Sequence, residues 1–185
     1  MKQNRWSVGG VEEVSCSLVK IKPVQLSFTT IQKVAILMSL VKTEWIAYLQ
    51  GKLEEDVIQV KDLVVPPHKE VSACSAEVEP FHIPTDCVGV IHSHRTMGTF
   101  HSLTDADYVD RTHPVSMVVS IQRGKIQFSA VSWVKTPCGK HSLVTLPVQE
   151  QSPEPTFNVV AFAEEALTNI KQGEKKNNLL NIIEV

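Results

Sequence analysis

Apolar residues recur at helical spacing in two parts of the chain. The first run follows the N-cap candidates of segment 27–30 and predicts a helix over residues 30–41. The second run begins at Val159 and predicts a C-terminal amphipathic helix that ends near Gly173. The positions that define the two runs are Ile31, Val34, Ala35, Met38 and Val41, and then Val159, Ala163, Ala166, Leu167 and Ile170.

Shorter stretches between these helices alternate or run apolar, and they are rich in the β-branched and aromatic residues that strands favour. They predict strands at residues 44–50, 56–65, 87–92, 115–121, 126–135 and 142–148. Residues 14–24 form either an opening strand or an irregular lead-in. Residues 68–84 show no clear period and predict a loop, within which 75–78 could form a short helix.

The order of these elements predicts a mixed α/β (α+β) fold with one mixed central β-sheet flanked by helices. A short helix is also expected at 104–111, with Thr104 as its N-cap. The length of 185 residues suits one domain of ordinary size. A polar, proline-containing segment predicts a linker over 151–158, between a main body at 14–150 and a helix and tail at 159–185.

Composition changes this picture mainly by excluding partners. The formal net charge of −2 gives no electrostatic reason to expect nucleic acid or an anionic membrane. No apolar run approaches the roughly 20 residues that span a bilayer, and the polar N-terminus has no apolar signal-peptide region. The cysteines are widely spaced with no C-x-x-C pair, which predicts reduced thiols and a cytoplasmic protein.

The segment most informative about chemistry contains two histidines separated by one residue, His92 and His94. On an extended strand these side chains point to one face, where both imidazoles can bind one metal ion. Asp105 lies at the start of the expected short helix, which can return its carboxylate to the same site. Two imidazoles and one carboxylate leave a fourth tetrahedral position open for water, as in catalytic zinc sites. Ser102 is a candidate hydrogen-bond donor to the oxyanion of an attacked carbonyl.

This spacing, H-S-H followed by seven residues and then S-x-x-D, resembles the JAMM motif of the MPN+ (Mov34/MPN/PAD-1) zinc metalloproteases. The family also places a glutamate on an upstream strand that follows the first helix, and Glu44 occupies that position here. The resemblance implies that one zinc ion is bound by His92, His94 and Asp105. It further implies that Glu44 is the general acid/base and that Ser102 stabilises the tetrahedral intermediate.

The resemblance covers about residues 14–150 and implies an MPN catalytic domain that hydrolyses peptide or isopeptide bonds. Family members most often remove ubiquitin or ubiquitin-like proteins from lysines of protein conjugates. Segment 136–141 is short where eukaryotic deubiquitinases of the family carry a longer insertion, so the chain resembles a minimal prokaryotic or archaeal relative of the proteasome-lid deubiquitinase. The proteasome, another protein or a second copy of the chain are therefore candidate partners. Arg95 stands where many members have proline, which changes the expectation for the loop rather than for the metal site.

Two other functions stay open at this point: a metallohydrolase of small amide or peptide substrates, and a non-catalytic MPN scaffold subunit. Scaffold subunits usually lack the ligands that this chain retains. His101 is expected to be a solvated loop histidine, with a substrate contact as the alternative. His68 has no assigned role. The C-terminal helix is expected to pack on the body of the protein, with a dimer contact or a partner-binding segment as alternatives.

Overall fold

The computed structural model describes residues 20–79, 83–95, 97–102, 114–136, 139, 141–151 and 157–183. The lead-in before residue 20, the helix expected at 104–111 and most of the expected linker lie outside these residues. Within these ranges the elements have the bounds β1 (Val24–Leu26), α1 (Phe28–Leu40), β2 (Ile46–Leu53), β3 (Ile58–Val64), β4 (His68–Val71), β5 (Ala76–Val78), β6 (Cys87–His94), β7 (Val115–Gln122), β8 (Lys125–Lys135), β9 (His141–Leu146), β10 (Val148–Glu150) and α3 (Val159–Ile183).

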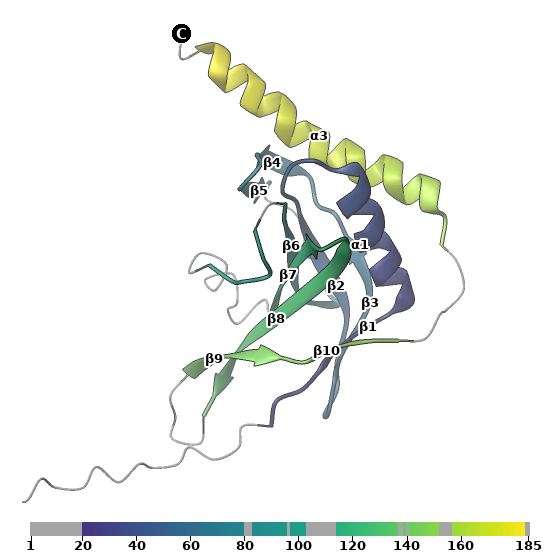
Figure 1. The fold of residues 1–185 in the computed structure, drawn as a ribbon, viewed down its shortest axis with the longest axis vertical. Helices are drawn as coiled ribbons and strands as arrows, with labels where there is room; N and C mark the ends of the chain where they lie inside the picture. The colour runs from purple at the N-terminus through teal and green to yellow at the C-terminus, as the bar shows by residue number, and fades with distance from the viewer. Residues whose placement is uncertain are drawn as a thin grey trace, which may run out of the picture.

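Eight of the described strands form one mixed sheet in the order β10-β1-β3-β2-β6-β7-β8-β9, and β4 and β5 form a separate hairpin. The β1–β3, β1–β10 and β6–β7 pairs are parallel, and the other pairs are antiparallel. The two edge strands, β9 and β10, are separated in the chain only by Pro147, and the sheet curls into a barrel-like shape (Figure 1). The mixed α/β class expected from the sequence is confirmed. However, α1 and α3 contact each other, so the sheet is not clearly flanked by helices.

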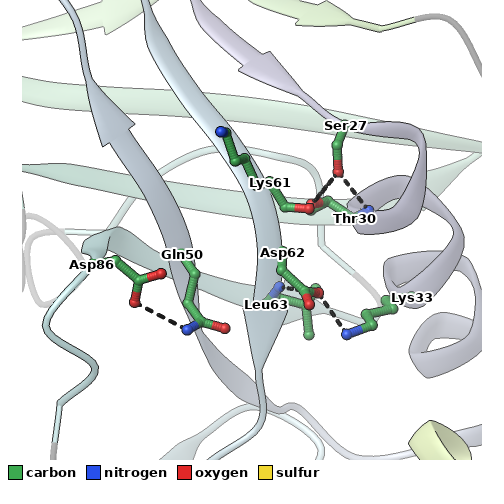
Figure 2. Close-up of polar contacts among 8 residues, drawn as sticks. All are labelled: Ser27, Thr30, Lys33, Gln50, Lys61, Asp62, Leu63 and Asp86. Atoms are coloured by element: carbon green, nitrogen blue, oxygen red, sulfur yellow. Dashed lines mark hydrogen bonds and ion pairs between the residues drawn. The ribbon is translucent and has the colours of Figure 1, made fainter. Parts of the chain in front are cut away.

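The first helix begins where the sequence supplies an N-cap. Ser27 Oγ accepts the N–H of Thr30 at 3.0 Å and donates to the Lys61 carbonyl of β3 at 2.7 Å (Figure 2). Lys33 adds an ion pair with Asp62 on the same strand. The helix predicted at 30–41 is therefore confirmed, and it starts two residues earlier because Ser27 caps it.

The hydrophobic core joins the sheet to both helices. Val34 and Leu37 of α1 are buried, and so are Ala166 and Ile170 of α3. Asn169 Nδ2 also donates to the Val65 carbonyl at 2.7 Å. The packing expected for the C-terminal helix is thus confirmed for its first half, whereas its second half extends past the sheet (Figure 1). Neither of the described helices is both long and apolar enough to cross a membrane.

Two elements continue through glycines that were expected to end them. The helix α3 runs to Ile183 rather than stopping near Gly173, because a single interior glycine costs only about 1 kcal/mol relative to alanine. The strand β2 runs on past Gly51, and its register with β3 shifts between Gln50 and Gly51. That glycine therefore marks a β-bulge rather than a strand end.

The expected loop at 68–84 contains a β-hairpin in its first part, so the short helix suggested at 75–78 is wrong. His68 pairs with Val78 and Val71 pairs with Ala76, across a turn in which Ser72 N–H donates to the Ser75 carbonyl at 2.8 Å. Strands of three or four residues are too short to show a period, and this is why the sequence pattern missed them.

Candidate metal centre

The strand β6 carries both candidate histidines at its C-terminal end. It extends to His94, two residues further than the apolar pattern predicted, because the polar residues Ser93 and His94 continue the ladder with β7. His94 is buried and His92 is half-buried. Alternation along the strand puts both imidazoles on one face and Ser93 on the other.

The two imidazoles are close enough to share a metal ion. His92 Nε2 and His94 Nε2 lie 3.2 Å apart. Two nitrogens bound to one tetrahedral zinc at about 2.05 Å would lie about 3.3 Å apart, so the separation fits that metal. His94 Nδ1 is 2.8 Å from the Gly98 carbonyl, which can only accept, so Nδ1 carries the proton and Nε2 has the lone pair that a metal needs.

Glu44 lies on the neighbouring strand segment, just before β2. Ile46 pairs with His92 in the antiparallel β2–β6 ladder, and the Ser93 N–H donates to the Trp45 carbonyl at 3.0 Å. Extended by one further step, this register would place Glu44 opposite His94. Directly opposed residues share a face with their Cβ atoms about 5 Å apart, and the Glu44 side chain is buried there.

Three consecutive backbone N–H groups anchor the segment that carries Glu44. The Glu44 N–H donates to the Ser72 carbonyl at 2.8 Å. The Trp45 N–H donates to Ser93 Oγ at 3.1 Å, and the Ile46 N–H donates to His68 Nε2 at 3.0 Å. The segment is therefore held on one side by β6 and on the other by the β4–β5 hairpin.

The remaining predicted residues follow β6 in the chain. Ser102 is exposed, and His101 is half-buried with both ring nitrogens inaccessible to solvent, so the expectation of a solvated His101 is wrong. Asp105 lies outside the described residues. Within the described ranges, no group of three or more His, Cys, Asp or Glu side chains could hold a metal ion. The structure thus brings His92 and His94 together, and it describes no third ligand.

Arg95 has a definite partner in the structure. Its Nη1 donates to the Met38 carbonyl at 2.8 Å, near the C-terminus of α1. The last turn of α1 has no basic residue of its own, so Arg95 supplies the positive charge that stabilises a helix C-terminus. The residue after His94 therefore ties the histidine strand to the helix that leads into Glu44.

Sequence reasoning missed the anchoring roles of Ser93 and His68. Ser93 has a readable signal, because a small polar residue between two same-face histidines must point into the opposite, buried face. His68 has no such local signal, since its partner Ile46 is set only by tertiary packing. The sequence matches no known protein-family model and no curated protein.

Proposed function

We propose that this chain is a zinc-dependent isopeptidase with an MPN-type fold, which removes ubiquitin or a ubiquitin-like modifier from protein conjugates. The observation that carries the proposal is the pair of Nε2 atoms 3.2 Å apart at the end of β6, beside the strand β2 that begins two residues after Glu44. Asp105 is the proposed third ligand. The free thiols of Cys74 and Cys87 agree with a reducing, cytoplasmic location.

The residues around the histidine pair suit hydrolysis of an amide. A bound zinc ion would lower the pKa of its water molecule far below that of bulk water, to about 7. Glu44, whose backbone N–H is held by the Ser72 carbonyl, accepts the proton from the attacking water and passes it to the leaving amine. Ser102, in the segment that follows β6, donates a hydrogen bond to the oxygen of the attacked carbonyl.

The hairpin supports an extended substrate rather than a small amide. The β4–β5 hairpin adjoins the Glu44 segment through the Ser72 carbonyl. Its short strands offer main-chain groups with which the C-terminal tail of a modifier can pair, which is a general mode of peptide recognition. A glycine at the cleaved bond would let the tail pass closely over the metal.

The decisive experiment measures zinc content and cleavage of a ubiquitin–peptide fusion. The purified chain should hold one zinc ion and cleave the fusion after its Gly-Gly end. A His92→Ala/His94→Ala double variant should lose both properties. A His141→Ala variant is the matched control, because His141 lies on β9, away from the β2–β6 pair, and both properties should survive.

The outcomes separate the alternative functions. Zinc binding without cleavage of the fusion, but with hydrolysis of short peptides, would favour a small-substrate metallohydrolase. Absence of zinc from the intact chain would contradict the proposal and favour a scaffold subunit.

A further inference from the structure

His68 is the most deeply buried histidine of the described chain, with none of its surface exposed. An imidazole in such a position needs a partner for each nitrogen, because an unpaired buried polar atom is costly. His68 has both partners: its Nδ1 lies 2.9 Å from the Pro66 carbonyl and its Nε2 lies 3.0 Å from the Ile46 nitrogen. The ring therefore bridges the start of β4 and the start of β2.

The two bonds fix one tautomer. The Pro66 carbonyl can only accept, so Nδ1 carries the proton, and Nε2 is left to accept the Ile46 N–H. Burial lowers the pKa of His68 from its ordinary value of 6.5 to about 4, although the Pro66 bond acts in the opposite direction. The acceptor nitrogen is thus maintained at neutral pH.

The ring replaces a strand partner that the backbone does not provide. The ladder between β2 and β3 runs from Leu53 back to Tyr48 and stops, because β3 ends at Val64 and two prolines follow. The Ile46 N–H lies beyond this ladder and points to the same side. The His68 side chain supplies the acceptor that the next residues of β3 would have supplied in a longer strand.

The backbone around Pro66, to which the His68 ring is bonded, is held in place by α3. Asn169 of α3 donates to the Val65 carbonyl, next to the Pro66 carbonyl that His68 contacts. The helix α3 also packs directly on β4. The position of Nε2 is therefore determined by the body of the protein rather than by a mobile turn.

From these contacts we infer that His68 is a positioning residue for Glu44: it fixes the backbone two residues along from that carboxylate, and so sets where the carboxylate meets the His92–His94 pair. The inference rests on the proposed function for the consequence in turnover. The hydrogen bond between His68 and Ile46, and its effect on the backbone of residues 44–46, are independent of that function. A leucine would fill the same space, but it would leave the Ile46 N–H buried without an acceptor.

The test compares His68→Leu, which keeps volume without an acceptor, with His68→Gln, whose amide oxygen can accept the Ile46 N–H. The matched control is Leu146→Ala, which opens a cavity in β9 away from the β2–β6 pair. Four properties are measured: melting temperature, zinc content, amide hydrogen exchange, and kcat and KM on the ubiquitin fusion.

In His68→Leu we expect amides 44–46 to exchange at least tenfold faster relative to that of Leu49, with zinc content unchanged. The kcat should fall about 10- to 100-fold with little change in KM, since small misplacements of a catalytic group have effects of this size. His68→Gln should recover most of both losses. Leu146→Ala should lower the melting temperature without either effect.

Unchanged exchange at residues 44–46 in His68→Leu would overturn the inference, as would an equal loss of kcat in Leu146→Ala. If His68→Leu does not fold, the intact chain still decides the question by NMR. A scalar coupling between the Ile46 amide nitrogen and His68 Nε2 is expected, and its absence would contradict the bridge. If the intact chain has no isopeptidase activity, the proposed function fails alone, because exchange and coupling still test His68.

Discussion

The two ends of the β2–β6 pair are held by different kinds of contact. At the candidate metal end, Ser93 and His68 accept the N–H groups of Trp45 and Ile46. At the far end, backbone packs directly on backbone, and a Cβ on Gly51 would lie only 1.8 Å from the Gln59 carbonyl oxygen. The metal end depends on the hydrogen-bond acceptors that its side chains supply. The far end depends on glycine, because the backbone approach leaves no space for a Cβ.

The two ends of this strand pair should therefore respond differently to substitution. Gly89 on β6 also has no space for a side chain, since a Cβ there would lie 2.3 Å from the Val115 carbonyl oxygen. We therefore expect substitutions at the far end to affect mainly folding stability, with the largest losses, whereas substitutions at the metal end should affect turnover and cost less stability. The following predictions test that division, beginning with the largest expected effect.

Gly51→Ala should destabilise the protein by about 4 kcal/mol or more, because the added methyl group meets backbone that cannot move without breaking the β2–β3 ladder. Chemical denaturation measures this change. Gly124→Asn is the control: no atom lies within 4 Å of a Cβ there, and asparagine tolerates the positive φ of 75°. Equal stability of the parent and Gly51→Ala would refute the steric account of this end.

Glu44→Gln should lower turnover of a ubiquitin fusion by roughly 100- to 10,000-fold, which is the usual contribution of a general base. The amide keeps the size of the carboxylate but accepts a proton poorly. Zinc content and melting temperature should stay close to those of the parent. Turnover at the parent rate would exclude Glu44 as the base.

Stability should fall with acid because of His68. Its folded pKa of about 4 lies below the ordinary 6.5, so the unfolded chain binds more protons between these values. The contribution is complete above about pH 6.5 and is lost as pH falls towards 4. At about 1.4 kcal/mol per pKa unit, it amounts to roughly 3 kcal/mol.

Denaturation at several pH values, with a chelator present so that zinc release does not contribute, measures this loss. His68→Gln should show a correspondingly smaller loss than the parent between pH 6.5 and 4. Parallel pH profiles for the two proteins would show that His68 is not the titrating group.

The smallest effect is expected at Arg95. Arg95→Met keeps much of the side-chain length but removes the bond to the Met38 carbonyl, which should cost about 1 kcal/mol of folding stability. Lys42→Met is the matched control, since Lys42 Nζ lies 3.4 Å from the Ser39 carbonyl at an exposed position. If both variants lose the same stability, Arg95 has no special role at the end of α1.

The elements with many residues were predictable from the sequence, because a period needs length to show itself. The helix α1 and the strands β3, β7 and β8 appear close to their expected bounds. The β4–β5 hairpin was not predictable. The continuation of β2 through Gly51 was not predictable either, because the close approach of the backbone there depends on the tertiary structure.

For the candidate site, alternation alone gave the shared face of His92 and His94. The position of Glu44 just before the strand that neighbours β6 follows from the sheet order β2–β6, which no local pattern contains. The contact of His68 with Ile46 likewise depends on where the chain travels after β3. Sequence patterns thus named the candidate side chains, whereas the groups that contact their backbone became visible only with the fold.

The position of α3 after the whole sheet in the chain has a consequence for synthesis on the ribosome. Ala166 and Ile170 belong to the core, and Asn169 donates to the Val65 carbonyl, so these contacts must wait until α3 has emerged. The strand β1 also waits for its neighbour β10, which follows β9 in the chain. Contacts between residues far apart in the sequence slow folding. In a growing chain, His92 and His94 would emerge before α3, whose contacts with Val65 and β4 hold the backbone around His68.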